Sequence, residues 1–350
     1  MPTLANLNVV TVQDIARETG LSPSSVSAVL SGQHVKRRIS SVTVERVQSA
    51  ARRLRYVPNV TARSLRAKAS GTKHVVLSIL TSYEAPVLLV TQALRAMERA
   101  VTRHADSAMD YTVNIEMYHA GQLAQLPGLI DGHRCNGAII TNTLDVDDQF
   151  LASAQFPFPV VLLGRRIPGY PGVSTQSEVM GQLAAEALVK AGRRRLAVLR
   201  TPVMGQAPRR RLAAFEAAAE KLTGSPPAVI LCETLQEKAG FDGMRRYLEG
   251  KPACDGLFAV TDSLAIGAYH AIKRSGRTIP RDIAVVGVGD NPASVYLDPP
   301  LTSFEVAEEA LNQAAVQMLL TLVNGGNPES RTVEVPVSLM VRESTGHRAT

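Results

Sequence analysis

Charge is distributed very unevenly along this chain of 350 residues. The first 70 residues hold 11 Lys and Arg against three Asp and Glu, whereas the rest of the chain holds 27 against 28. One end is therefore strongly basic and the remainder is close to neutral. A basic module attached to a neutral domain is the electrostatic pattern of a protein that binds a polyanion.

The basic module has the apolar spacing of short helices. Thr11 can cap a first helix, and Gly20 can end it in the left-handed conformation. Ser22 can cap a second helix with Pro23 in its first position, where the missing N–H costs nothing. Two helices joined by about four residues that include a glycine predict a helix-turn-helix.

A third helix is expected to begin near Ser41, because Val44, Val47, Ala51 and Leu54 form one apolar stripe. Pro58 then interrupts the chain. Residue 59 could cap a short fourth helix over residues 60–65, and residues 69–71 have the composition of a linker.

The second helix presents small residues on its expected outer face, namely Ser24, Ser25, Ser27 and Ala28. Hydroxyl groups of this kind can reach phosphate oxygens or base edges of DNA. The alternative is an ordinary polar helix surface.

These segments resemble the DNA-binding headpiece and hinge of the LacI/GalR family of bacterial transcription regulators. The resemblance runs in order through residues 11–16, 20–22, 26–32, 56–59 and 62–65. It implies that the second helix enters the major groove of DNA. It also implies that residues 59–65 form a hinge helix in the minor groove, with Leu65 opening a central base step.

Two departures from the family pattern bear on the operator sequence. Ala28 stands where the family commonly has an arginine that contacts guanine, so a methyl contact with thymine is expected instead. The connection over residues 32–40 is longer than usual and contains Lys36, Arg37 and Arg38, which are expected to contact phosphates. A solvated surface loop is the alternative for this run. The predicted DNA-contacting residues are Thr11, Gln13, Ser22, Ser24, Ser25, Ser27, Ala28, Ser31, Lys36, Arg37, Arg38, Asn59, Ala62 and Leu65.

From residue 74 onward, short apolar runs alternate with amphipathic helical stretches. The runs cover residues 75–80, 137–141, 160–164, 196–199, 256–260 and 283–288, and the helical stretches cover 88–103, 180–191, 210–222 and 264–275. This alternation predicts an α/β body with parallel sheets. Ligands on such sheets bind at the carboxyl ends of the strands.

The sequence carries no pattern of catalytic or metal-binding residues. The dinucleotide pattern that begins at Gly287 lacks its third glycine, no nucleophile motif occurs, and the seven histidines show no ligand spacing. The three cysteines also lack paired spacing and are expected to be reduced. We therefore predict no enzymatic activity, no cofactor and no metal.

The body resembles the effector-binding core of the same family, which has two lobes of the periplasmic-binding-protein type. The resemblance runs through residues 183–186, 192–197, 211–215, 261–267, 280–287, 300–303 and 341–345. It implies an all-α headpiece and hinge helix followed by a two-lobed α/β core. The residues predicted to contact an effector are Arg165, Arg211, Thr261, Asp262 and Asp290.

Each of these assignments has a plainer alternative. Arg211 matches the family's effector clamp, but it also belongs to the basic run 209–211, which could lie on the surface. Asp262 could simply cap a helix, and Arg165 could face either the cleft or solvent. Gly289 stands where many members have an aspartate that holds sugar hydroxyls, which weakens an acceptor-rich sugar pocket. The effector is therefore expected to be a sugar other than a simple pyranose or an anionic metabolite, or to be absent.

The predicted domains are residues 1–58 for DNA binding, 59–73 for the hinge and linker, and 74–350 for the core. We predict a transcription regulator of the repressor type. It is expected to bind a palindromic operator as a homodimer and to respond to a small molecule. A dimer rather than a tetramer is expected because no heptad segment follows the core. The N-terminus lacks a signal-like pattern and no apolar run could span a bilayer, so we expect a cytoplasmic, nucleoid-associated protein with no membrane partner. The alternative is a solute-binding protein without a regulatory role.

Overall fold

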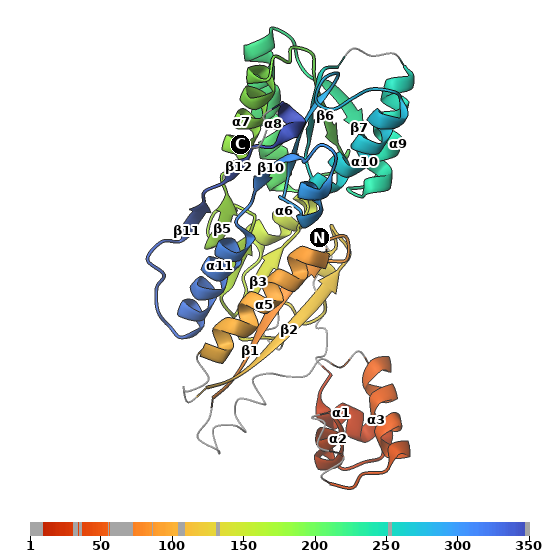
Figure 1. The fold of residues 1–350 in the computed structure, drawn as a ribbon. Coiled ribbons are helices and arrows are strands. Elements are labelled where there is room, and N and C mark those ends of the chain that lie inside the picture. The colour runs from red at the N-terminus through yellow and green to blue at the C-terminus, as the bar shows by residue number, and fades with distance from the viewer. Residues whose placement is uncertain are drawn as a thin grey trace, which may run out of the picture.

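The computed structural model describes residues 10–30, 34, 37–54, 56, 73–85, 87–103, 109–130, 134–250 and 254–346 (Figure 1). The basic module contains the three predicted helices, α1 (Val12–Thr19), α2 (Pro23–Leu30) and α3 (Ser41–Arg53). Ile15, Val26 and Val47, one from each helix, are fully buried in a small common core. The predicted helix over residues 60–65 lies outside the described residues, so the domain boundaries near residues 58 and 73 stay predictions.

The sequence signals for the first two helices are confirmed in atomic detail. The backbone N–H of Asp14 donates to the Thr11 hydroxyl at 3.3 Å, and the Thr11 N–H donates back to the Asp14 carboxylate at 2.8 Å. Gly20 follows α1 with a φ of +63°. The Ser25 N–H donates to the Ser22 hydroxyl at 3.2 Å, so Ser22 begins α2 as expected.

The body consists of two lobes, each built on a six-stranded sheet (Figure 1). The sheet of lobe 1 has the order β11-β5-β4-β3-β1-β2, and all its neighbouring strands are parallel. Its strands are β1 (Lys73–Ser82), β2 (Met109–Tyr118), β3 (Gly137–Thr141), β4 (Val160–Leu163), β5 (Gly172–Thr175) and β11 (Thr332–Val335). Its helices are α5 (Val87–Arg103), α6 (Asp145–Ser153) and α11 (Glu308–Val323).

The sheet of lobe 2 has the order β12-β10-β9-β8-β6-β7, and only β12 runs antiparallel to its neighbour. Its strands are β6 (Leu196–Arg200), β7 (Ala228–Leu231), β8 (Gly256–Ala259), β9 (Ala284–Val288), β10 (Thr302–Glu305) and β12 (Ser338–Met340). Its helices are α7 (Ser177–Lys190), α8 (Gln206–Thr223), α9 (Glu237–Glu249) and α10 (Asp262–Arg274).

The chain crosses between the lobes three times. The crossings follow β5, β10 and β11, at residue 176, at residues 306–307 and at residues 336–337. Ala307 has a φ of +47°, a left-handed conformation that is uncommon for a residue with a side chain. This turn ends β10 and directs α11 back to lobe 1.

Close helix packing fixes the position of α8 within lobe 2. A Cβ atom added to Gly181 of α7 would lie only 2.7 Å from the backbone nitrogen of Phe215, so glycine lets the two helix backbones approach each other. Phe215 itself is fully buried against Phe258 of β8, with ring centroids 4.7 Å apart. The side chains on the first turns of α8 are thus held rigidly at the edge of the sheet.

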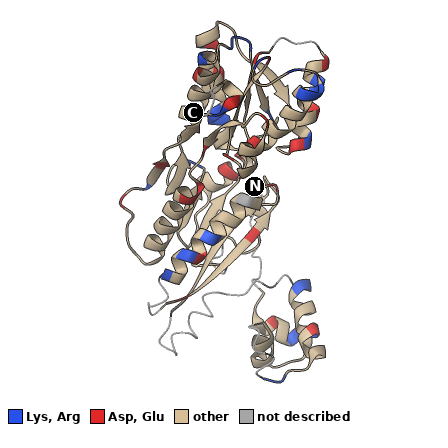
Figure 2. Cartoon of the chain, viewed as in Figure 1, with Lys and Arg blue, Asp and Glu red and all other residues tan. Residues whose placement is uncertain are grey.

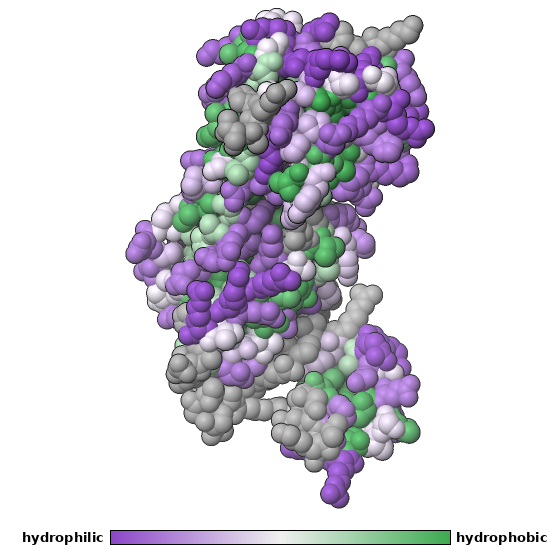
Figure 3. All heavy atoms as spheres, in the orientation of Figure 1, coloured by the Kyte–Doolittle hydropathy of each residue, from purple (hydrophilic) through white to green (hydrophobic). Residues whose placement is uncertain are grey.

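All six predicted apolar runs form strands, whereas β2, β5, β7, β10, β11 and β12 are not among those runs. β2 and β7 form one edge of each sheet, and β11 and β12 form the other. An edge strand has one neighbour and a partly solvated surface, so polar residues interrupt its apolar pattern. The surface of the molecule seen in Figure 3 carries both hydrophilic and hydrophobic residues. No helix in the described ranges is long and apolar enough to cross a membrane.

Candidate nucleic-acid interface and effector cleft

The N-terminal half of α2 presents a cluster of serine hydroxyls. Ser22 and Ser24 are exposed, and Ser25 and Ser27 are partly exposed. The Ser22 oxygen lies 2.9 Å from the Ser25 oxygen and 3.4 Å from the Ser24 oxygen. These small hydroxyls can approach a polyanion closely and donate hydrogen bonds to it.

Ala28 does not project from this face as predicted. Its exposed fraction is 4%, so the expectation of an outer methyl group is wrong for this structure. An alanine methyl extends only slightly beyond the helix backbone, so neighbouring groups cover it. A contact between Ala28 and a thymine methyl would require these groups to move.

Thr11 and Gln13 lie at the start of α1, and both are exposed. Gln13 is available to a partner. The Thr11 hydroxyl already donates to the Asp14 carboxylate at 2.7 Å, and these hydrogen bonds, followed by Arg17, hold the pKa of Asp14 below its usual value. Thr11 therefore has a structural role that sequence reasoning did not assign to it.

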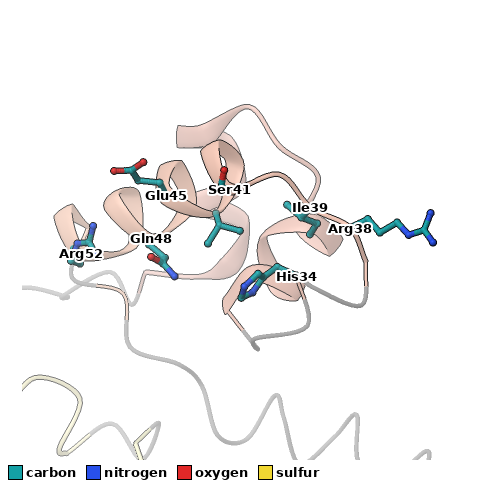
Figure 4. Close-up of a pocket in the computed structure, with 8 residues that line it drawn as sticks. His34, Arg38, Ile39, Ser41, Glu45, Gln48 and Arg52 are labelled. Atoms are coloured by element: carbon teal, nitrogen blue, oxygen red, sulfur yellow. The ribbon is translucent and has the colours of Figure 1, made fainter.

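The basic loop before α3 is exposed at both of its described arginines, Arg37 and Arg38. Arg38 has a φ of +52°, and the next residue, Ile39, donates its N–H to the His34 carbonyl at 3.0 Å. In Figure 4 the Arg38 side chain extends away from the other labelled residues, which line an open groove beside α3. Figure 2 shows this loop and α3 as basic segments of the headpiece. Ser31, Lys36, Asn59, Ala62 and Leu65 lie outside the described residues.

In the core, Arg211 is a buried cation on the second turn of α8. It is 7% exposed and donates to the Val260 carbonyl at 2.8 Å, which excludes the predicted alternative of a surface residue. Its Nε has no hydrogen-bond partner among the described residues. Burial lowers the pKa of Arg211 to about 10, although Glu308 and Asp262 oppose this effect. A buried guanidinium with a free donor suits an anionic or hydroxyl-rich ligand.

Asp262 serves the fold rather than an open site. It is 3% exposed and accepts from the Asn291 N–H at 2.7 Å, the Ser303 hydroxyl at 2.7 Å and the Ser294 hydroxyl at 2.9 Å. The helix cap expected of Asp262 belongs instead to Thr261, whose hydroxyl accepts from the Leu264 N–H at 3.4 Å. Asp262 therefore neither caps the helix nor offers a free carboxylate to an effector. Because three donors occupy its carboxylate, it holds the loop after β9 in place.

Asp290 lies in that loop with a φ of +45°, and its carboxylate is 2.7 Å from the Arg342 guanidinium. It lines an open cavity of about 510 Å³ between the end of β9 and the first turn of α11. Glu305, Glu308 and Gln92 line the same cavity. Burial raises the pKa of Glu308 to about 7, and Arg211 opposes the shift. Asp290 of lobe 2 and Glu308 of lobe 1 thus line one cavity, and the charge of Arg211 acts on the Glu308 carboxylate.

Arg165 belongs to a separate group. It is 5% exposed, so the predicted alternative of a solvent-facing side chain is wrong. It donates to the Thr143 hydroxyl and carbonyl and lies 3.7 Å from Asp148, while burial lowers its pKa. Two of its donors are used within lobe 1, on Thr143. Its role as an effector contact stays a prediction.

Sequence reasoning missed Glu308, Arg342 and Gln206, which lie beside the predicted site residues. Glu308 opens a helix after β10, a strand that was not predicted, and Arg342 comes to Asp290 from 52 positions further along the chain. No spacing rule connects such positions. Within the described residues, no group of three or more metal-ligating side chains is present.

Comparisons with known proteins cover up to 96% of the chain. The sequence profile of bacterial regulatory proteins of the lacI family matches residues 11–59, and that of a periplasmic binding protein-like domain matches residues 185–345. The chain is 29% identical to the HTH-type transcriptional regulator GntR of Pseudomonas aeruginosa, with 96% of this chain and 95% of that protein covered. It is 26% identical to the HTH-type transcriptional repressor PurR of Haemophilus influenzae, with 95% and 98% covered.

Solved structures show the same architecture. The lac repressor dimer bound to operator and the anti-inducer ONPF is 26% identical, with a TM-score of 0.68 and coverage of 96% of this chain and 99% of that one. The complex of the transcriptional regulator CelR with cellobiose shares the fold at 23% identity, with a TM-score of 0.67 and coverage of 96% and 99%. The headpiece and the two-lobed core therefore occur together, in this order, in known regulators.

Proposed function

Because this chain belongs to the LacI family of bacterial regulatory proteins, we propose that it represses transcription by binding a palindromic operator as a homodimer, under the control of a small-molecule effector. The family consists of transcription regulators and not of enzymes. The observation that carries the proposal is the joining of a basic helix-turn-helix headpiece to a two-lobed core within one chain.

In this proposal α2 reads the operator. Its serine cluster, Ser22 to Ser27, contacts phosphates and base edges in the major groove, and Gln13 and Arg38 add contacts beside it. The hinge residues Asn59, Ala62 and Leu65 occupy the minor groove at the centre of the site. Two-fold symmetry of the dimer makes the operator palindromic, with half-sites about one helical turn apart.

The effector site is proposed around Arg211, Asp290 and Glu308. Asp290 and Glu308 line an open cavity, the buried Arg211 cation interacts electrostatically with Glu308, and both kinds of group can bind hydroxyls. Similar proteins include a regulator solved with cellobiose and a LacI family regulator solved with ribose. A sugar or a sugar acid therefore fits this site best. We propose that such a repressor acts on chromosomal DNA and is therefore located in the cytoplasm, associated with the nucleoid.

The proposal is tested with purified full-length protein and a random double-stranded DNA library. Repeated selection should enrich one palindrome, and fluorescence anisotropy should give much tighter binding to it than to one half-site. Ribose, cellobiose and gluconate are then added to the complex, and one of these classes should change operator affinity. Enrichment of no sequence, or equal binding to a half-site, would contradict the proposal.

A further inference from the structure

The first turn of α8 in lobe 2 makes direct polar contacts with lobe 1. Figure 1 shows α6, which carries part of this contact surface, at the junction of the lobes. The lobe 1 partners lie at the start of α6 and in the loop between β4 and β5. The polar contacts come from Gln206 and Arg209, and Gly205, the residue before α8, lies closely against Arg165.

Gln206 makes a reciprocal pair of hydrogen bonds across the junction. The Arg166 backbone N–H donates to the Gln206 Oε1 at 2.7 Å, and the Gln206 Nε2 donates to the Arg166 carbonyl at 3.1 Å. A side-chain amide thus pairs with both polar groups of one residue as a neighbouring strand would. This geometry requires one donor and one acceptor at a fixed separation, which a side-chain amide provides without any change of protonation.

Arg209 forms the second contact. Its guanidinium is paired with the carboxylate of Asp145 at the start of α6. Both side chains are about half exposed, so this pair alone contributes little to stability. Its position one turn after Gln206 nevertheless fixes the orientation of the α8 axis on lobe 1.

Gly205 shows that the junction is built for close approach. Its φ of −70° and ψ of 175° are open to any residue, so the backbone itself does not require glycine. A Cβ atom at this position would lie 2.5 Å from one guanidinium nitrogen of Arg165 and 2.8 Å from the other. Arg165 cannot easily move aside, because Thr143 and Asp148 hold it and it is almost fully buried. Glycine is therefore needed here only while the lobes are closed.

We propose that Gly205, Gln206 and Arg209 form a latch that holds the two lobes closed without a ligand. The contacts of the protein itself then close the two lobes, and an effector binds to a core whose lobes are already closed. This inference concerns the core alone and depends neither on operator binding nor on the identity of the effector.

The test measures the distance between the lobes in full-length protein without DNA or effector. Nitroxide labels are placed at Ser153→Cys in α6 and Glu220→Cys in α8, both exposed, in a Cys254→Ser background, because Cys254 is the least buried native thiol. Mixing labelled with excess unlabelled protein keeps both labels of a measured pair within one protomer. Double electron–electron resonance should give one narrow distance distribution.

Gly205→Ala is the sharpest variant, because its methyl group collides only in the closed arrangement. Both Gly205→Ala and Gln206→Ala should shift the distribution of label distances to longer values. In both variants the Arg166 backbone amide should exchange its hydrogen at least tenfold faster than in the parent protein. Arg245→Gln removes an equally exposed ion pair within α9 and should change neither measurement. A circular dichroism spectrum identical to that of the parent protein establishes that each variant is folded.

Two results would overturn the latch. One is a broad distribution of long distances in the parent protein, which would show that the lobes are open without ligand. The other is an unchanged narrow distribution in both Gly205→Ala and Gln206→Ala, which would show that other contacts hold the lobes together.

Discussion

The guanidinium of Arg211 donates a hydrogen bond of 2.8 Å to the carbonyl of Val260, directly after β8. This bond fixes a buried cation at the carboxyl end of the lobe 2 sheet, where open α/β sheets bind their ligands. One end of the guanidinium is held by the protein, and its Nε has no partner among the described residues. This relationship makes Arg211 the strongest candidate for effector contact.

Arg211→Lys should lower effector affinity at least tenfold, about 1.4 kcal/mol, while leaving operator affinity unchanged. Lysine keeps the charge but loses the planar fork that can hold Val260 and a ligand together. The measurement is calorimetric titration with a compound that changes operator binding of the parent protein. Arg246→Lys, at an exposed position on α9, is the matched control. Equal affinities of parent and Arg211→Lys protein would remove Arg211 from the site.

Glu308→Gln should stabilise the core at neutral and alkaline pH. The pKa of Glu308 is raised from 4.5 to about 7 by burial, so the folded state binds this proton more tightly than the unfolded state. The carboxylate consequently costs stability as pH rises from about 4.5 to 7, by up to about 3 kcal/mol above that range. Urea denaturation should show a more stable variant at pH 8 and no difference near pH 4.5.

Glu309→Gln provides the control for this effect. Glu309 is the next residue on α11, 65% of its side chain is exposed, and it pairs with Arg99 on the surface. Its replacement should change stability by no more than about 1 kcal/mol at either pH. A similar gain at pH 8 in both variants would assign the effect to the net charge of the protein instead of to the buried position.

Replacing Lys36, Arg37 and Arg38 together by Ala should weaken DNA binding in a salt-dependent way. If each cation contacts a phosphate, the slope of log K against log salt falls by up to about 2.7 per subunit, at ~0.9 for each contact. The change should be equal on operator and random DNA, since phosphates carry no sequence identity. Anisotropy titrations at several salt concentrations measure the slope. An unchanged slope favours a solvated loop, and an altered base preference shows contact with base edges.

Leu65→Ala should weaken binding to the operator and leave binding to random DNA nearly intact. An inserted leucine offsets the cost of unstacking only where the central base step deforms easily, so its loss removes that discrimination. Competition titrations with an operator and with a scrambled duplex give the two affinities. Equal losses on both duplexes would show that Leu65 does not act at the central step.

Local sequence signals were sufficient for the headpiece and for the central strands. The Thr11 cap, the left-handed Gly20 and the apolar stripe of α3 each act within a few residues, so their effect is visible in the sequence. Buried central strands such as β3 and β8 are apolar throughout because helices or neighbouring strands surround them. Edge strands lack this pattern, and Ala28 showed that helical spacing alone does not settle exposure.

The role of each polar residue in the core was decided only by the tertiary structure. The sequence indicated that Arg165, Arg211, Asp262 and Asp290 follow strands or lie on neighbouring helices, and it therefore placed them near a cleft. It did not indicate that Asp262 is saturated by Ser294, Ser303 and Asn291, or that Thr143 holds Arg165. A side chain's role depends on which donors and acceptors surround it, and here those partners come from segments 22 to 52 positions away. Chain order determines the elements, whereas the folding of distant segments against each other determines which polar groups stay free to bind a ligand.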